Sequence, residues 1–419
     1  MPASAELASL TTGEDSMATT AVTVPHRAGL YLALLQLFFT LCWTVYAIYL
    51  PALAATAGIP RGAVVLLLML DQAIFTIADF ATGVASDKVS KVLGRLGYWA
   101  AAITLLSCAA FLALPFAASG GTAVFMTLTV IWAVTSSALR APPLMLLGKY
   151  AAKPAIPWLA ALAMLGYGLA GAAGPYLAVA LRQQDPRWPF ALASIALVLT
   201  SFGLVAVERH LANTAPVPAK AKTMAKTPLS RRAVAFGLAL IVLALGYQLH
   251  FAINSAPLFL RFAKPSDLEY LMPIFWIGFN LAMLPASRYT DRIGAYPMMG
   301  VAALLGALAI LATAAASSLE WMILAQAASG AAWGCILMAA FALAFSIGQN
   351  GHEGAMAGLL FSALALATFA RMAVTASGLI ADETFRAAIV WMPTACWIFA
   401  GAALIYAALS RTDIAQPSL

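Results

Sequence analysis

Twelve long apolar segments, each of roughly membrane-spanning length, constrain this 419-residue chain more than any other feature. Hydrophobic residues make up 63% of the chain and charged residues 9%, whereas an ordinary soluble domain has about 25% charged residues. The sequence therefore predicts an all-α integral membrane protein with twelve transmembrane helices. The segments lie at about 28–55, 62–86, 96–118, 122–148, 156–181, 188–207, 233–260, 270–289, 296–316, 320–347, 355–381 and 387–410.

One long polar segment, residues 208–232, divides six spans from six, which predicts two pseudo-symmetric six-helix bundles at 28–207 and 233–410. Residues 1–27 and 411–419 are expected to be cytoplasmic tails, the first of them disordered. Most of the 23 Lys and Arg residues fall in the tails, in this linker and in the loops on the same side. Because cytoplasmic loops are enriched in Lys and Arg, we expect a multi-pass protein of the cell (inner) membrane with both termini in the cytoplasm.

Span 2 carries two carboxylates inside its apolar run, Asp71 and Asp79, followed by Gly83 and Asp87. Positions four apart stay close to one face of a helix, so these residues are expected to form one stripe from deep in the membrane to its surface. A carboxylate at the bilayer centre costs about 2.5–3.5 kcal/mol on insertion scales and normally has a partner or a function. The two acids are therefore the first candidates for chemistry.

The two halves repeat one pattern. Gly83-x-x-x-Asp87-Lys88 follows span 2, and Ser287-Arg288-Tyr289-Thr290-Asp291-Arg292-Ile293-Gly294 follows span 8. In both, a small residue stands four before an Asp that can lie against the N-terminus of a neighbouring helix. Internal repetition is typical of secondary carriers. The residues predicted to form conformational gate loops are Gly83, Asp87, Lys88, Asp291, Arg292 and Gly294.

The twelve spans, the central linker and the Asp291-Arg292-x-Gly294 loop resemble the major facilitator superfamily over essentially the whole chain. Span 5 reads GYGLAGAAGP and is similar to the glycine–proline motif of proton-coupled drug antiporters, although Ala178 and Val179 replace expected glycines. Asp79-x-x-x-Gly83-x-x-x-Asp87 resembles the glycoside–pentoside–hexuronide:cation symporters, although Phe75 replaces their second acid. The resemblance implies a carrier that works by alternating access, with spans 2 and 11 facing each other.

Asp71 in span 2 and Arg371 in span 11 both lie about ten residues from the outer ends of their spans, roughly 15 Å deep. We therefore expect them to meet between the halves and to form or break an ion pair during transport. A base beside an acid keeps it ionised, and loss of that base in a dry cavity favours protonation. The alternative is a static pair that only joins the halves.

Arg140 in span 4 and Asp79 in span 2 lie at comparable depth, which predicts a second ion pair within the first half. The arginine resembles one in span 4 of the drug antiporters, but Pro142 and Pro143 follow it where that family has a glycine. The pair is either structural or part of a proton relay or an anion site.

The resemblance implies that spans 1, 4, 7 and 10 line a substrate cavity. In span 7, His250 and Asn254 share a face and could bind substrate or carry protons; alternatively, they form hydrogen bonds between helices. Each remaining candidate has packing as its alternative. The predicted cavity residues are Gln36, Thr40, Trp43, Tyr46, Trp132, Ser136, Tyr247, Gln248, His250, Asn254, Gln326, Ser329 and Trp333.

The sequence lacks the HExxH and GxSxG motifs of metalloproteases and serine hydrolases, so we expect no enzyme. Its four cysteines show no metal-like spacing, and its net charge of +7 is dispersed, so neither a metal, a cofactor nor nucleic acid is expected. We expect a monomeric secondary transporter of a small organic solute, coupled to a proton rather than sodium, working as an efflux antiporter or a symporter. The competing class is a non-transporting membrane sensor or a lipid-handling protein.

Overall fold

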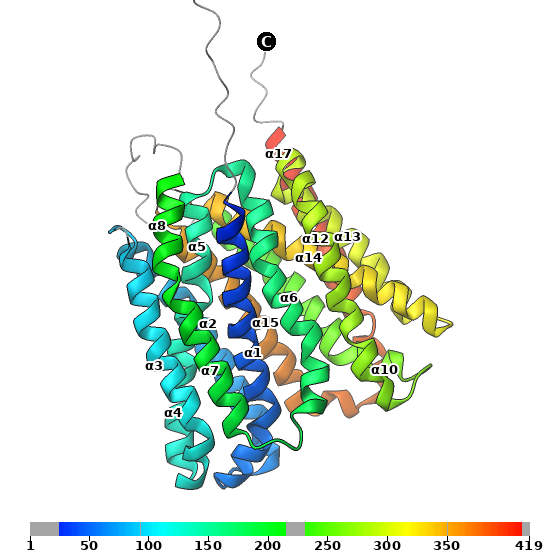
Figure 1. The fold of residues 1–419 in the computed structure, drawn as a ribbon. Coiled ribbons are helices and arrows are strands. Elements are labelled where there is room, and N and C mark those ends of the chain that lie inside the picture. Colours follow the sequence, from blue (N-terminus) through cyan, green and yellow to red (C-terminus); the bar gives the residue numbers. More distant parts are fainter. Residues whose placement is uncertain (1–24, 93, 215–230, 350, 413–419) are drawn as a thin grey trace, which may run out of the picture.

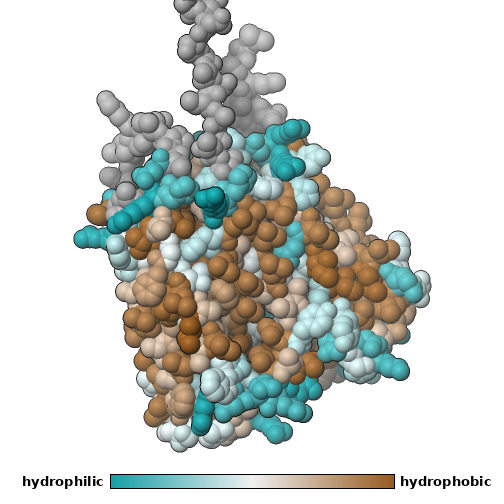
Figure 2. All heavy atoms as spheres, in the orientation of Figure 1, coloured by the Kyte–Doolittle hydropathy of each residue, from teal (hydrophilic) through white to brown (hydrophobic). Residues whose placement is uncertain are grey.

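A computed structural model describes residues 25–92, 94–214, 231–349 and 351–412. Twelve helical segments in these ranges are long and apolar enough to cross a membrane, which confirms the predicted number of spans. Figure 2 shows a hydrophobic band across the middle of the face in view, with hydrophilic residues gathered at both ends. The fold is therefore an all-α bundle whose outer surface matches a bilayer.

The first six spans form one half of the molecule (Figure 1). Four of their helices cross without interruption, whereas spans 4 and 6 are each divided in two. The helices are α1 (His26–Thr56), α2 (Val64–Val89), α3 (Arg95–Ala117), α4 (Thr122–Ser136), α5 (Ala141–Tyr150), α6 (Ile156–Ala180), α7 (Arg187–Phe202) and α8 (Leu204–Thr214).

The last six spans form the other half. Span 7 contains a π-helical turn, Leu249–Asn254, between two α-helices. The helices are α9 (Arg231–Gln248), α10 (Ser255–Phe259), α11 (Leu268–Leu271), α12 (Pro273–Ile293), α13 (Ala295–Ala314), α14 (Leu319–Ile347), α15 (Glu353–Ala376), α16 (Glu383–Ile389) and α17 (Met392–Thr412).

Span 6 continues further than the sequence indicated. Helix α8 runs to Thr214, so the expected linker 208–232 begins inside a helix. The reason is a buried acid: Glu208 is inaccessible to solvent and accepts a hydrogen bond from the backbone N–H of Gly97, in the first turn of α3, at 2.9 Å. The expected tail 1–27 is helical from His26 onward. Residues 1–24, 215–230 and 413–419 lie outside the described residues.

The halves meet along two pairs of helices, α2 with α15 and α6 with α12. The start of α1 and the end of α17 lie at the same end of the bundle, uppermost in Figure 1. We call this the termini end and the other the opposite end. Helix α2 ends and helix α15 begins at the termini end, so the Asp87 region of one half lies beside the N-terminus of a helix in the other.

Candidate functional site

A cavity of about 320 Å³ lies between the two halves, and we call it the central cavity. Ten of its 23 lining residues are aromatic, and amides, hydroxyl groups and two guanidinium groups lie among the rings. Both halves contribute side chains, and α1, α2, α9 and α15 each supply at least one polar group. The lining residues are Gln36, Phe39, Thr40, Trp43, Gln72, Phe75, Trp132, Ser136, Arg140, Met164, Tyr167, Tyr247, Gln248, Phe251, Ala252, Trp333, Leu337, Phe341, Phe361, Leu364, Thr368, Arg371 and Met372.

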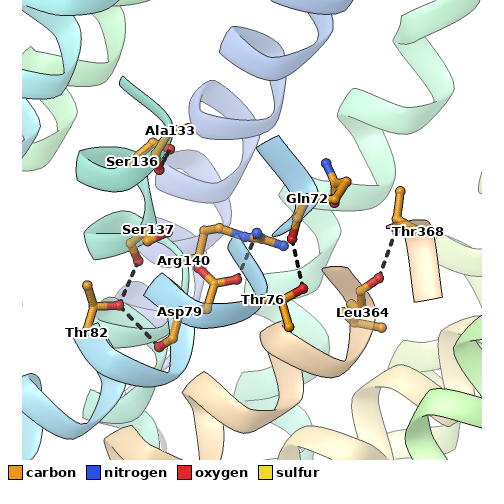
Figure 3. A network of polar contacts seen from close by, with 10 residues as sticks. All are labelled: Gln72, Thr76, Asp79, Thr82, Ala133, Ser136, Ser137, Arg140, Leu364 and Thr368. Carbon is orange, nitrogen blue, oxygen red and sulfur yellow. Dashed lines mark hydrogen bonds and ion pairs between the residues drawn. The ribbon is translucent and has the colours of Figure 1, made fainter. Parts of the chain in front are cut away.

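Arg140 lies at a break in span 4. Pro142 and Pro143 have no N–H to donate to residues four positions earlier, so the α-helical ladder cannot pass through this point. The chain instead forms a short 3₁₀ turn at Ser137–Leu139 and restarts as α5. The break places the Arg140 side chain against α2, where its Nη1 lies 2.8 Å from Asp79 Oδ2 (Figure 3). The predicted ion pair is thus present.

Both halves of the molecule enclose the Arg140 guanidinium. Its Cζ lies 4.7 Å from the ring centroid of Phe75 in α2 and 5.1 Å from that of Phe361 in α15. Asp79 itself is fully buried. Such cation–π contacts contribute about 0.5–2 kcal/mol each, with more when the site is dry. Arg140 therefore has its charge partner in its own half and a ring contact across the interface.

Asp71 and Arg371 do not form the expected ion pair in this conformation, and its formation and loss during transport stays a prediction. Asp71 is fully buried and accepts a hydrogen bond from the Tyr46 hydroxyl at 2.8 Å. Arg371 donates from Nε to Gln248 Oε1 at 3.1 Å. The reason is helical drift: each step of four residues turns the side chain by about 40°, so Asp71 is rotated by about 120° from Gly83, which faces α15. Asp71 points into its own half.

Eight of the thirteen predicted cavity residues line the central cavity: Gln36, Thr40, Trp43, Trp132, Ser136, Tyr247, Gln248 and Trp333. Five predicted residues do not line it: Tyr46, His250, Asn254, Gln326 and Ser329. Tyr46 lies behind the wall, bonded to Asp71.

The other four residues, His250, Asn254, Gln326 and Ser329, make buried hydrogen bonds within the second half. His250 Nε2 lies 3.1 Å from Ser329 Oγ, and Gln326 donates to Ser255 Oγ at 2.9 Å. Asn254 donates to the carbonyl of Ile389 at 3.0 Å. The π turn in span 7 adds a residue to one turn, which changes the direction of the side chains that follow. The alternative reading, hydrogen bonds between helices, therefore describes these side chains.

Sequence reasoning missed several polar residues of the cavity. Gln72 follows Asp71 directly, and Thr368 precedes Arg371 by three residues on α15. For Thr368 the usable signal was its position on the same helix face as Arg371, since residues three apart are neighbours on a helix. Gln72 points about 100° away from Asp71 around α2, so the position of Asp71 gave no signal for it. Arg140 and Arg371, which were predicted as ion-pair residues with a relay or anion site as the alternative for Arg140, also line the cavity.

At the termini end, Asp87 joins the halves. Its Oδ1 and Oδ2 accept hydrogen bonds from the backbone N–H groups of Gly354 at 2.7 Å and Ala355 at 2.9 Å, in the first turn of α15. A carboxylate at a helix N-terminus is favoured by the helix dipole and by the unpaired amides there. The predicted arrangement of an Asp against a neighbouring helix N-terminus is therefore present in the first repeat.

The second repeat is built differently. Asp291 is exposed, and Arg288 instead places its guanidinium 5.3 Å from the ring centroid of Trp158, in the first turn of α6. Two prolines near that N-terminus, Pro154 and Pro157, remove backbone donors that a carboxylate could use. The gate loops share one further feature: Gly94 and Gly294 have φ of +79° and +89° and precede α3 and α13.

Searches with the sequence against protein-family models and against curated proteins give no match. The structure is similar to that of the human organic anion transporter MFSD10 (TETRAN), at 16% identity and a TM-score of 0.68, covering 92% of this chain and 99% of that one. It is also similar to a bacterial homologue of the iron transporter ferroportin in an outward-facing state, at 14% identity and a TM-score of 0.70, covering 91% and 99%.

A third similar structure is the proton:xylose symporter XylE of the major facilitator superfamily, at 14% identity and a TM-score of 0.67, covering 90% and 94%. At these identities the similarity concerns the fold, and it extends over nearly the full length of each protein. Together with the twelve spans and the repeated gate loops, it identifies the fold of this chain as that of the major facilitator superfamily.

Proposed function

We propose that the protein is a secondary transporter that moves a small organic solute across the membrane by alternating access, coupled to a proton. The central cavity carries this proposal, because both halves supply its polar groups in the middle of a membrane-length bundle. A site placed between two bundles can be exposed to either side by rocking one bundle against the other. This arrangement suits a carrier better than an enzyme.

The proposed cycle begins in the conformation described here, with the halves joined at the termini end through Asp87 and α15. The distribution of Lys and Arg supports a cytoplasmic location for this end, so in the proposed cycle the cavity of this conformation opens toward the outside. Opening the cytoplasmic side requires Asp87 to leave the α15 N-terminus and Phe361 to leave Arg140. We propose that the protein works as a monomer in the cell membrane.

Asp71 is the residue that we propose to carry the coupling proton. It is fully buried, and its one hydrogen-bond donor is the neutral Tyr46 hydroxyl. An isolated buried carboxylate without a cation is costly, whereas its protonated form is not. The Tyr46 ring packs 4.5 Å from the ring of Trp132, which lines the cavity. Solute on Trp132 can therefore influence the contact that Asp71 depends on.

Asp79 has a different proposed role. Because it is already paired with Arg140, its charge is compensated, and the pair would hold the guanidinium at the cavity wall. Proton coupling is proposed over sodium coupling because sodium prefers several oxygen ligands, whereas Asp71 has a single contact, with Tyr46. This assigns proton exchange to Asp71 and positioning to Asp79.

Proteoliposomes test the proposal directly. The purified full-length protein is reconstituted with a pH-sensitive dye inside, and a panel of organic solutes is added with and without an imposed proton gradient. A carrier should give solute-dependent proton flux, with choline able to replace sodium. Proton and solute moving together indicate symport; movement in opposite directions indicates antiport. Absence of proton-linked flux with every solute that binds would reject the proposal.

The Asp71→Asn variant makes the test specific. Asparagine keeps a hydrogen-bonding oxygen for Tyr46 but cannot exchange a proton, so uphill accumulation should be lost while solute exchange at equal pH continues. Asp291→Asn, at an exposed position, is the matched control and should keep both activities. Intact uphill transport by Asp71→Asn would remove Asp71 from the coupling mechanism.

A further inference from the structure

We propose that the central cavity selects a small organic monoanion with a flat apolar body, whose acidic group binds to Arg371. This inference rests on the proposed carrier function and adds a substrate class to it. It depends on four properties of the cavity: its charge, the orientation of its free guanidinium, its unpaired hydrogen-bond donors and its aromatic walls.

The side chains that line the cavity, together with Asp79, carry a net charge of one positive unit. Both charged residues that line the cavity are arginines. Asp79 neutralises Arg140 at 2.8 Å, whereas the contact of Arg371 is the side-chain oxygen of Gln248, which is neutral. No carboxylate lines the cavity in the described part of the chain. The Arg371 guanidinium is only partly exposed, and it favours an anion beside it because an uncompensated charge is costly away from water.

A chain of hydrogen bonds holds Arg371 in place. Gln248 accepts from Arg371 Nε at 3.1 Å and donates from Nε2 to Thr368 Oγ1 at 2.9 Å. Thr368 in turn donates to the carbonyl of Leu364 at 2.9 Å (Figure 3). Because only Nε of the guanidinium is used, its two terminal nitrogens keep their N–H groups for a ligand. A planar guanidinium oriented in this way suits the two oxygens of a carboxylate.

Two further donors in the wall have no partner in the protein. Gln36 is 3% exposed and Trp333 is 1% exposed, yet Gln36 Nε2 and Trp333 Nε1 make no hydrogen bond. Most buried donors in proteins are hydrogen-bonded, to protein or to ordered molecules. Both residues line the central cavity, and both unpaired atoms are donors. A ligand rich in acceptor oxygens could accept hydrogen bonds from these two donors and from the free N–H groups of Arg371.

Aromatic rings from both halves make the cavity flat-walled. Trp43 stacks on Trp132 with an interplanar angle of 14° in the first half, and Tyr247 stacks on Trp333 at 5° in the second. Parallel ring faces favour a planar apolar group between or against them. The cavity volume of 320 Å³ is at the low end for ligand pockets, which suits one or two rings. A second negative charge on the ligand would find no further free cation in this wall.

Binding measurements with matched probes test this inference. Benzoate, phenylacetate and indole-3-acetate are titrated against the purified full-length protein by calorimetry or thermal shift, beside the neutral amides of the same acids and benzylamine. At least one carboxylate should bind tenfold or more tightly than its amide, and benzylamine should not bind. Equal affinity of each acid and its amide, or preference for the amine, overturns the inference.

Variants locate the binding to Arg371. Arg371→Gln should weaken carboxylate binding at least tenfold and abolish the preference over the amide, whereas Arg371→Lys should keep part of the preference. Thr368→Val, which releases Gln248, should weaken binding less than Arg371→Gln. Arg182→Gln, which removes an exposed charge, is the control and should bind normally. If Arg371→Gln folds poorly, the lysine variant provides the comparison; unchanged affinity in both overturns the inference.

The outcomes separate this inference from the carrier proposal. Carboxylates that bind through Arg371 without any proton-linked flux would support the monoanion site and reject transport. Proton-linked flux of neutral or cationic solutes with no carboxylate binding would support transport and reject the monoanion site.

Discussion

Gly83 of α2 and Gly354 of α15 bring the two halves into backbone contact at the termini end. A Cβ atom on Gly83 would lie 2.3 Å from the carbonyl oxygen of Gly354, and a Cβ on Gly354 would lie 2.4 Å from the carbonyl oxygen of Gly83. Neither position has room for a methyl group, because a backbone oxygen of the other helix lies within 2.4 Å of each Cβ position. Close approach of helices through small residues is common in membrane bundles, and here it occurs between the halves.

We expect Gly83→Ala to open the termini end, because the added methyl group must push α2 and α15 apart. The conformation described here should become a minor state, and solute transport should fall severalfold or more. Distance measurements between spin labels or dyes, one in each half at the termini end, would detect the opening. Gly174→Ala is the control, since a Cβ there meets nothing closer than Thr44 Cγ2 at 3.9 Å. Unchanged distances in Gly83→Ala would contradict the expectation.

Asp87→Asn should weaken the contact between α2 and α15 at the termini end without pushing the two helices apart. Asparagine offers one acceptor oxygen in place of two and has no charge, so one of the bonds to Gly354 and Ala355 is lost. Hydrogen bonds to charged groups contribute about 1.5–3 kcal/mol, and 1.4 kcal/mol changes an equilibrium tenfold. The same distance measurements should show a shift of about ten- to a hundredfold toward the state open at the termini end. Asp291→Asn, in the second repeat, should show no shift; equal shifts in both variants would argue against a cap at α15.

Removal of one member of the Asp79–Arg140 pair should cost more than removal of both. Asp79→Ala leaves a buried guanidinium and Arg140→Ala leaves a buried carboxylate, each worth about 3–5 kcal/mol when unpaired. The double variant leaves neither charge, so its loss of stability should be smaller than the sum of the single losses. Thermal unfolding and transport of all three proteins measure the coupling. Additive losses would show that the two side chains act independently.

Phe361→Leu should alter the conformational equilibrium through Arg140. The substitution keeps an apolar side chain of similar size in α15 but removes the ring that Arg140 contacts across the interface at 5.1 Å. With a cation–π contact contributing about 0.5–2 kcal/mol, we expect a two- to thirtyfold shift toward the state open at the termini end. Phe259→Leu, a buried ring of α10 in a cluster that contains only residues of the second half, is the control for loss of ring packing alone.

The pH dependence of transport follows from the proposed role of Asp71. If solute binding requires the protonated acid, acidification of the side to which the cavity opens should favour binding, and this dependence should disappear in Asp71→Asn. Tyr46→Phe removes the donor that stabilises the ionised form, so its transport should stay active to higher pH than the wild type. A wild-type pH profile in Asp71→Asn would contradict the assignment.

The number of spans could be predicted because length and hydropathy alone determine it. The Asp79–Arg140 pair could be predicted from depth because both residues belong to the same half and neighbouring spans. Equal depth was not sufficient to predict a contact between Asp71 and Arg371. Side chains four residues apart on a helix differ in direction by about 40°, and this difference adds up along the helix. Equal depth therefore restricts which residues can meet, but rotation about the helix decides whether they do.

The cavity was predicted better in the first half than in the second. In span 1, an unbroken helix, Gln36, Thr40 and Trp43 keep the spacing of one face and all line the cavity. In span 7 the π turn after Gln248 ends that regularity, so Tyr247 and Gln248 face the cavity while His250 and Asn254 do not. Pro257 in the sequence predicts that the helix of span 7 is irregular. Its position does not show which turn of the helix is altered.

The difference between the two gate loops affects how the closed termini end is stabilised. Asp87 has a helix N-terminus to bind, whereas Asp291 faces solvent beside a helix whose start carries two prolines. If the two repeats were built alike, each loop would contribute about equally to the stability of the closed termini end. Here one carboxylate caps the helix of the other half, so we expect a substitution or protonation of Asp87, or an anion that competes for the α15 N-terminus, to favour opening of the termini end.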